Sequence, residues 1–230
     1  MVAFVAALVV AAGSSPAGSA CASYRPTDAA AYAAVVHRPL RVYRRPSAKP
    51  FSSFGRRNVN GVRTVFGVLD ARTGADCRPT WLWVHVPMRP NGAAGWIRAR
   101  DVTLRKVSAR IVIDLSTRRV TLFEAGIETF STRAAIGSPA TPTPTGSYYV
   151  NQKIVPDDPR GPYGVGAMGI SAFSPVLKNW PQGGPVAIHG TNQPWLLGRR
   201  ISNGCIRVTN AAIRRLWRAA PPGTPVLIRR

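Results

Sequence analysis

The strongest indications of fold and chemistry lie in two segments, IHGTN at residues 188–192 and ISNGCIRV at residues 201–208. Cys205 follows His189 by 16 residues, and each of the two has a glycine neighbour. Acyl transfer at a carbonyl needs a nucleophile, a base that activates it and donors for the oxyanion. A free cysteine has a pKa of about 8.5, so it needs a histidine or cationic partner to be mostly ionised at neutral pH. The segments therefore predict Cys205 as nucleophile and His189 as base.

The residues around Cys205 meet the remaining requirements. Gly204 has no Cβ, so a substrate carbonyl can approach closely, and we expect the N–H groups of Gly204 and Cys205 to hold the oxyanion. Arg207 adds positive charge, which favours a thiolate. We therefore expect a free Cys205 thiol with a low pKa.

The base of a Cys–His pair is usually oriented by a third group. Residues 159–230 contain no Asp or Glu. The acceptor for His189 must then be a backbone carbonyl, a side-chain amide or a distant acid such as Asp114. We favour a carbonyl near Gly190.

Taken singly, both residues have a simpler interpretation. A lone cysteine is most often a buried structural thiol, and a lone histidine is most often a hydrogen-bonded core residue. The flanking glycines and the turn-forming sequence before Cys205 favour the catalytic interpretation of the pair.

The charge of the chain indicates a polyanionic neighbour. Lys and Arg number 31 against 9 acids, a formal net charge of +22. Such a balance is typical of proteins that contact nucleic acid, anionic lipid or an anionic cell wall. The arginines are scattered in ones and twos, without an RNA-binding motif, zinc finger or basic heptad helix. We therefore expect a solvated basic surface and no nucleic-acid partner.

The first residues predict export. An apolar run over residues 2–12 leads to small residues ending Ala20-Cys21-Ala22, which fits a signal peptide over residues 1–22, although no Lys or Arg precedes the run. Cys21 permits a second interpretation, a lipoprotein acylated at that cysteine, and we expect at most a peripheral membrane association or this lipid anchor. In an oxidising compartment Cys21 and Cys77 are the natural disulfide pair if Cys21 is retained, which leaves Cys205 free.

Two β-rich units follow a linker expected over residues 23–37. Residues 38–104 alternate short apolar segments with turns, which predicts a small half-open β-barrel module without a catalytic constellation. No Cys or carboxylate lies at metal-binding spacing from its histidines, His37 and His85, so we expect no metal site. Residues 108–230 predict a mostly-β unit with one short helix, whose N-cap we assign to Asn210.

The motifs of the second unit resemble those of L,D-transpeptidase catalytic domains, the YkuD-like fold. The similarity rests on His189-Gly190-Thr191, on Ser202 to Arg207, and on the TPTPTG segment at residues 141–146. It covers residues 108–230 and implies a β-sandwich with a short helix. Residues 81–97 are similar to a module found ahead of such domains, which implies an SH3-like barrel. Many family members carry His in place of Asn203 and Asn in place of Arg207.

The resemblance implies an activity and a set of site residues. Cys205 would attack a peptidoglycan stem tetrapeptide, release D-Ala and pass its thioester to the amine of a neighbouring stem, giving a 3→3 cross-link. His189 would move the proton, Trp195 would pack on the substrate, and no metal or organic cofactor would be needed. The residues implied to line the site or hold the oxyanion are Gly190, Thr191, Ser202, Asn203, Gly204 and Arg207.

Two alternatives stay open on the sequence. A hydrolase of the L,D-carboxypeptidase type differs only in that water replaces the acceptor amine. A non-catalytic protein that binds the cell wall or another polyanion would use the N-terminal module and keep Cys205 as a structural residue.

Overall fold

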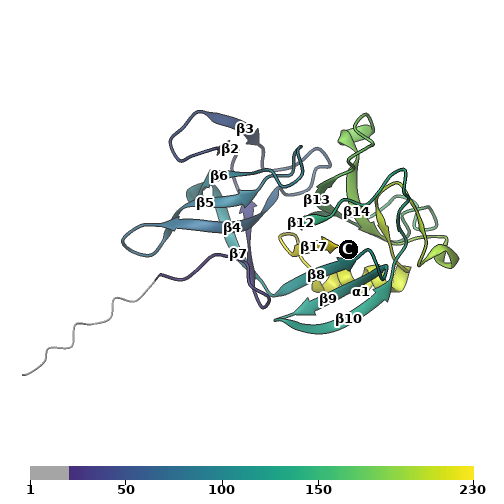
Figure 1. Ribbon diagram of the computed structural model, residues 1–230. Helices are drawn as coiled ribbons and strands as arrows, with labels where there is room; N and C mark the ends of the chain where they lie inside the picture. Colours follow the sequence, from purple (N-terminus) through teal and green to yellow (C-terminus); the bar gives the residue numbers. More distant parts are fainter. Residues whose placement is uncertain (1–20) are drawn as a thin grey trace, which may run out of the picture.

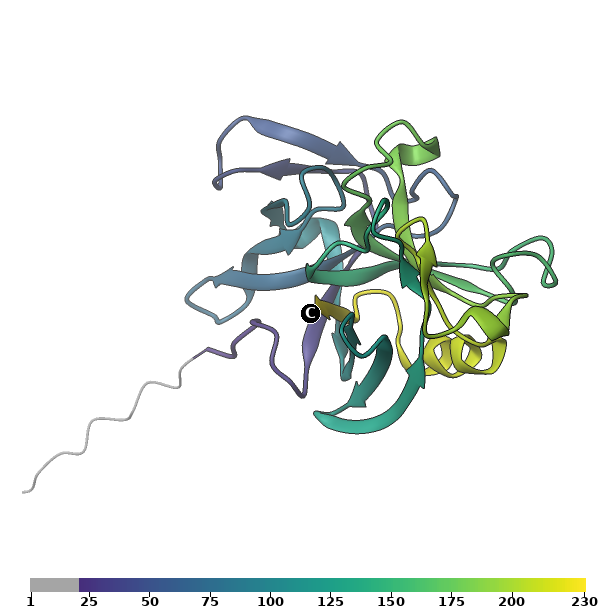
Figure 2. The same ribbon diagram turned by 45° about the vertical axis from the view of Figure 1, so that its right-hand side comes forward.

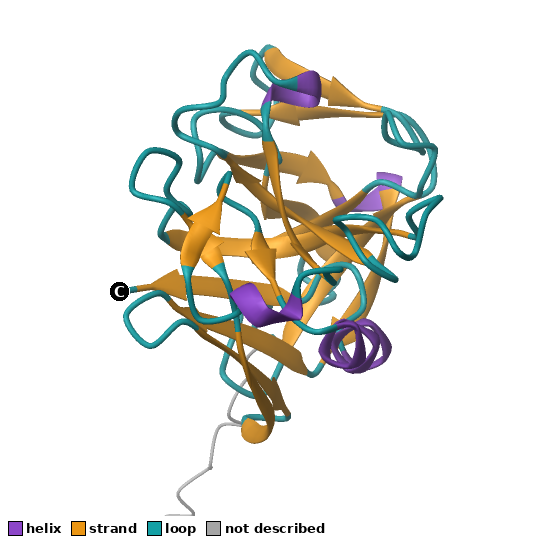
Figure 3. Ribbon diagram, turned by 90° about the vertical axis from the view of Figure 1, so that its right-hand side faces the viewer, coloured by secondary structure: helices purple, strands orange, loops and turns teal. Residues whose placement is uncertain are grey.

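Residues 21–230 are described by the computed structural model, in which they form two β-rich units (Figure 1). We call residues 31–107 the module and residues 108–230 the C-terminal domain. The module holds a seven-stranded sheet, and the C-terminal domain holds an eight-stranded sheet and a two-stranded one. Strands dominate the described residues, and α1 (Asn210–Ala219) is their single α-helix (Figure 3). The predicted mostly-β fold class is confirmed, whereas the SH3-like topology of the module stays a prediction.

The module sheet has the strand order β3-β2-β6-β5-β4-β1-β7. Every neighbouring pair in it is antiparallel. Its strands are β1 (Ala31–Val36), β2 (Leu40–Tyr43), β3 (Pro50–Phe54), β4 (Val65–Thr73), β5 (Pro79–His85), β6 (Ala94–Arg98) and β7 (Val102–Val107).

The predicted linker over residues 23–37 is wrong where β1 lies. This Ala-rich strand pairs with both β4 and β7, so it is an interior strand of the sheet. Ala33 and Ala34 are buried, and a Cβ at Gly223 of the C-terminal domain would lie 2.2 Å from the Ala33 Cβ. Alanine is a poor strand former by itself, but only a small side chain fits where two units approach so closely.

The larger sheet of the C-terminal domain has the order β10-β9-β8-β17-β12-β13-β14-β16. Its strands are β8 (Ala109–Asp114), β9 (Arg119–Glu124), β10 (Ile127–Arg133), β12 (Gly146–Ile154), β13 (Ala167–Phe173), β14 (Pro185–His189), β16 (Ile206–Arg207) and β17 (Pro225–Arg229). The small sheet pairs β11 (Ile136–Gly137) with β15 (Arg200–Ser202). Alternating buried residues of β8, β9 and β12 form the core with the apolar face of α1.

The N-cap of helix α1 lies one residue earlier than the sequence predicts. Thr209, with extended backbone dihedrals, is the N-cap, and its hydroxyl accepts a hydrogen bond from the Ala212 amide at 3.1 Å. The prediction of Asn210 as N-cap is therefore wrong. The Asn210 carboxamide oxygen accepts from the amides of Val165 and Thr191 instead. Asparagine is the slightly better N-cap residue in general, so the tertiary hydrogen bonds of the Asn210 side chain decide for Thr209 here.

The two units pack directly on each other, and Figure 2 shows them side by side. A Cβ at Gly67 of β4 would lie 2.9 Å from the Tyr149 ring of β12, so the absence of a side chain permits this approach. Asn91 of the module exchanges two hydrogen bonds of 2.8 Å with the backbone of Phe173. The module is therefore fixed against the sheet that carries the candidate site.

The cysteines fall into a pair and a single thiol. Cys21 and Cys77 form a disulfide, and Cys205 is free, which confirms the predicted pairing. The disulfide uses the Cys21 sulfur, which a lipoprotein would need for its lipid. The disulfide can form only in a chain that retains Cys21. The rest of the predicted signal peptide, residues 1–20, lies outside the described residues. Within residues 21–230 no helix has the length and apolar character needed to cross a membrane.

Candidate active site

The register of the larger sheet brings His189 and Cys205 together. Strands β14 and β16 are parallel, with Ile188 opposite Ile206 and His189 opposite Arg207. Cys205 immediately precedes this pairing, so it lies opposite Ala187 and diagonal to His189. Strands in a sheet are about 4.8 Å apart, and diagonal neighbours are within reach of long side chains. Both residues line one pocket of about 750 Å³.

A backbone carbonyl orients His189, as the sequence predicts. Nδ1 of the buried imidazole lies 2.6 Å from the Gly190 carbonyl oxygen. Because a carbonyl only accepts, Nδ1 carries the proton, and Nε2 is left as the basic nitrogen. The alternative acid, Asp114, is engaged elsewhere: it accepts from Ser116 at 2.6 Å and forms an ion pair with Arg229 at 3.2 Å.

The electrostatics of the site favour an uncharged resting pair. Burial lowers the pKa of His189 to about 4, with the Gly190 hydrogen bond opposing this shift and the charge of Arg207 adding to it. Burial raises the pKa of the Cys205 thiol, although the Ala187 amide and Arg207 act in the opposite direction. The expectation of a low thiol pKa is therefore wrong, because desolvation of the half-buried thiol outweighs the nearby positive charge. The pair holds a thiol and a neutral imidazole at neutral pH.

The turn before Cys205 is closed by the side chain of Ser202. This buried hydroxyl donates to the Cys205 carbonyl at 2.6 Å and accepts from the Gly204 amide at 3.2 Å. Gly204 has a φ of +108°, a conformation that side chains disfavour, so glycine is required there for the turn itself. Because its N–H already bonds to Ser202, Gly204 is not a free oxyanion donor in this state, contrary to the expectation. The Cys205 amide stays the predicted donor.

The TPTPTG segment holds this turn through side-chain hydrogen bonds, a role that the sequence did not predict. Thr143 is buried, and its hydroxyl donates to the Gly204 carbonyl at 2.9 Å while accepting from the Gly137 amide at 2.9 Å. Thr141 donates to the Ser202 carbonyl at 3.0 Å. Prolines exclude the segment from helix and sheet ladders, which leaves its hydroxyls to bond the turn Ser202–Cys205.

The other predicted site residues divide into two groups. Asn203, exposed, and Arg207, half-buried, line the pocket together with Ser202. Thr191 is buried and binds backbone instead: its hydroxyl accepts from the Gln193 amide at 3.0 Å. Gly190 contributes its carbonyl to His189 and lies under Asn210, whose Oδ1 would be 2.2 Å from an added Cβ. Both are positioning residues in this arrangement.

Two aromatic residues at the pocket were missed by sequence reasoning. The Tyr163 ring lies 4.8 Å from the His189 ring, centroid to centroid, and Trp180 lines the same pocket with 47% of its surface exposed. Both lie in loops without hydrophobic periodicity. The only signal that the sequence gives there is a Gly- and Pro-rich composition, which indicates a loop and not a site. Trp195, the aromatic residue expected on the substrate, is 69% exposed and is not among the lining residues.

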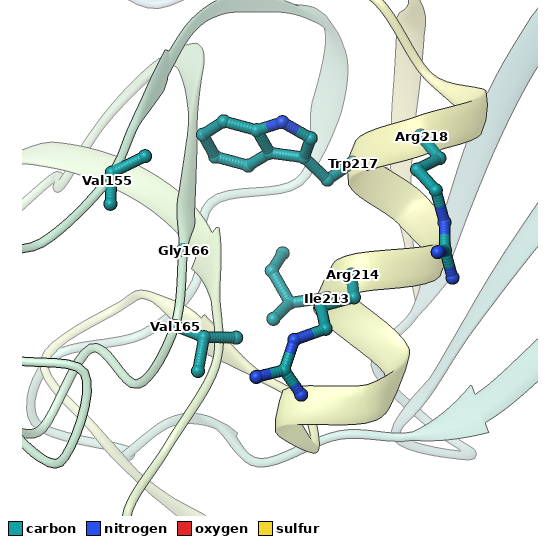
Figure 4. Close-up of a pocket in the computed structure, with 7 residues that line it drawn as sticks. All are labelled: Val155, Val165, Gly166, Ile213, Arg214, Trp217 and Arg218. Atoms are coloured by element: carbon teal, nitrogen blue, oxygen red, sulfur yellow. The ribbon is translucent and has the colours of Figure 1, made fainter.

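A smaller pocket, of about 300 Å³, lies against one side of α1 (Figure 4). Trp217 and Ile213 of the helix face Val155 and Val165 across it, as the figure shows. This pocket shares no lining residue with the pocket of His189 and Cys205. The pocket beside α1 is therefore separate from the candidate active site.

The comparison with known protein families decides the identity of the C-terminal domain. The family described as the L,D-transpeptidase catalytic domain matches residues 108–228, which include His189, the turn Ser202–Cys205 and α1. This chain belongs to that family. The resemblance noted in the sequence is thereby confirmed.

Relatives of this L,D-transpeptidase family member are similar over part of its length. The YkuD protein of Bacillus subtilis is 34% identical over 96 residues, which make up 42% of this chain and 51% of the relative. The corresponding protein of Bacillus licheniformis is 30% identical over 119 residues, 52% of this chain and 64% of the relative. The chain thus spans between half and two thirds of the length of these relatives. An Enterococcus faecium L,D-transpeptidase structure is 25% identical, with a TM-score of 0.40 over 53% of this chain and 49% of that one.

Proposed function

We propose that this chain is an exported peptidoglycan L,D-transpeptidase that forms 3→3 cross-links through a thioester on Cys205. The observation that carries the proposal is the arrangement of a free thiol and an oriented, neutral imidazole at one solvent-accessible pocket. Family membership supplies the substrate class, peptidoglycan stem peptides.

The proposed reaction begins with two uncharged groups. His189 Nε2 takes the thiol proton as Cys205 Sγ attacks the carbonyl between residues three and four of the stem tetrapeptide. The Cys205 amide stabilises the oxyanion, and the positive charge of Arg207 favours the thiolate. The C–N bond then breaks, His189 returns the proton to the leaving amine, and D-Ala departs. The amine of a neighbouring stem attacks the thioester, loses its proton to His189 and restores the thiol.

Product analysis with a defined tetrapeptide donor tests the transferase assignment. We expect release of D-Ala, and a cross-linked product when an acceptor stem is added. Mass spectrometry of the products with and without acceptor distinguishes the outcomes. Tripeptide alone in both reactions would establish a hydrolase and contradict the transferase proposal.

Export and wall association belong to the same proposal. The Cys21–Cys77 disulfide supports an oxidising compartment and a leader that ends before Cys21 instead of after residue 22. The net charge of +22 suits retention at an anionic wall. Amino-terminal sequencing of the mature protein tests the boundary: a first residue beyond Cys21 would contradict it.

A further inference from the structure

A carboxamide cluster joins the module to the wall of the active-site pocket. It consists of Asn58 and Asn60 in the module loop between β3 and β4, Gln152 on β12 and Gln182 in the short 3-10 helix Pro181–Gly183 before β14. Asn58 Nδ2 donates to Gln152 Oε1 at 2.7 Å. Asn60 Nδ2 donates to Gln152 Oε1 at 2.9 Å, and Gln182 Nε2 donates to Asn60 Oδ1 at 2.9 Å. Asn60, Gln152 and Gln182 line the same pocket as His189 and Cys205.

The cluster lies in register with the nucleophile. Gln152 pairs with Gly169 on β13, Gly169 pairs with Ala187 on β14, and Ala187 lies opposite Cys205. Three strand spacings separate the two ends, so the Cα atoms of Gln152 and Cys205 are about 14 Å apart. The residues between them, Gly169 and Ala187, are small, so this row forms a floor along which the Gln152 side chain extends over Gly169. The Gln152 Cγ would lie 2.7 Å from a Cβ added at Gly169.

This length matches an extended peptide. Stem residues one to three span about 10 Å at 3.3–3.6 Å each. The side chains of Gln152 and Cys205, at the two ends of the floor, cover the rest of the distance between their Cα atoms. A donor whose third residue is attacked by Cys205 therefore places its amino-terminal linkage at the carboxamide cluster.

The chemistry of the cluster suits peptide amides. A carboxamide offers both a donor and an acceptor, which complements the N–H and C=O of a peptide group. Asn60 is half-buried and Gln182 is exposed, so their mutual bonds can be exchanged for bonds to a ligand. Arg207, at the nucleophile end, is the only charged residue among the described residues that line the pocket. The cluster end is therefore suited to an uncharged part of the substrate.

We propose that Asn60 and Gln182 bind the amide groups of the amino-terminal residues of the acyl donor, so that the module completes the donor site. The inference rests on the proposed function and adds a specificity residue from outside the catalytic domain. Binding energy from this remote part of the substrate positions the carbonyl at Cys205.

The test compares Asn60→Ala with the wild type on three acylating agents. These are a stem tetrapeptide, an N-acetylated dipeptide of stem residues three and four, and a carbapenem. We expect kcat/KM for the tetrapeptide to fall about tenfold, as for the loss of one or two hydrogen bonds to substrate. The two short agents do not reach the cluster, so their rates should change by less than about twofold. Gln182→Ala, at an exposed position, should show the same dependence on donor length.

Asn91→Ala is the matched control. It removes another carboxamide that joins the module to the C-terminal domain, at a contact outside the pocket lining. An equal loss of kcat/KM for the tetrapeptide in Asn91→Ala would mean that only the packing of the module on the C-terminal domain matters. An equal loss of rate with all three agents in Asn60→Ala would mean a general structural effect. Either result, or an unchanged tetrapeptide rate in Asn60→Ala, overturns the inference. Wild-type protein that acylates with no agent would instead contradict the proposed function.

Discussion

At the scale of single residues, burial sets the protonation states of His189 and Cys205. Sequence spacing was sufficient to predict His189, Cys205 and the carbonyl that orients the imidazole. It could not predict the protonation states, because desolvation depends on residues that are distant in the chain. Two other features also depend on contacts that the sequence does not show. They are the Tyr163 ring beside the imidazole and the hydrogen bond that engages the Gly204 amide.

The pH dependence of acylation should report this burial. His189 must be neutral to accept the thiol proton, so the rate should fall as pH decreases through its pKa of about 4, and not near 6.5. Arg207 lowers the pKa of both members of the pair. Arg207→Gln should therefore move the acidic limb to higher pH. Carbapenem acylation rates between pH 3.5 and 8 provide the measurement.

Arg214→Gln is the charge-matched control for that profile. Arg214 is exposed on α1 and does not line the active-site pocket, so its removal should leave the limb in place. A wild-type limb near pH 6.5, or equal shifts in both variants, would contradict the role given to burial and to Arg207.

At the scale of elements, the nucleophile turn depends on a segment 60 residues earlier in the chain. Thr143 and Thr141 bond the carbonyls of Gly204 and Ser202, each across 61 positions. The strands of the C-terminal domain followed from apolar periodicity, as in the hairpin of β8 and β9. Strand β1 was missed because its alanines are selected by close packing between units, which periodicity does not report.

Replacing Thr143 by valine tests the support of the turn. The change keeps the shape but removes the hydroxyl, which leaves the Gly204 carbonyl and the Gly137 amide without this partner in a buried position. We expect a stability loss of about 1–3 kcal/mol and an acylation rate about tenfold lower. Thr143→Ser keeps the hydroxyl and should acylate within about twofold of the wild type. Wild-type acylation by Thr143→Val would show that the turn does not need this bond.

At the scale of the whole molecule, the module and the C-terminal domain pack together, and both line the pocket. Close approaches at Gly67 and Gly223 and the hydrogen bonds of Asn91 fix their arrangement. The sequence predicted two units but gave no sign of this contact, because each unit reads as an ordinary β pattern on its own. The contribution of Asn60 to the pocket therefore required the structure.

The disulfide should stabilise the module without affecting the chemistry. Cys21 and Cys77 are 56 residues apart, and closing such a loop stabilises a folded chain by about 2–4 kcal/mol. We expect Cys77→Ser to lose that stability in urea unfolding while keeping its acylation rate, since Cys205 remains free. Titration of the oxidised wild type in denaturant should give one thiol. Three thiols would contradict the pairing.

Intact-mass measurement after incubation with a carbapenem shows whether Cys205 is a nucleophile that His189 activates. We expect a single adduct on the wild type, mapped by peptide analysis to Cys205. We expect no adduct on Cys205→Ala, and greatly slowed addition to His189→Ala at pH 7. A wild-type mass that stays unchanged, or an adduct that persists in Cys205→Ala, would contradict this role of Cys205.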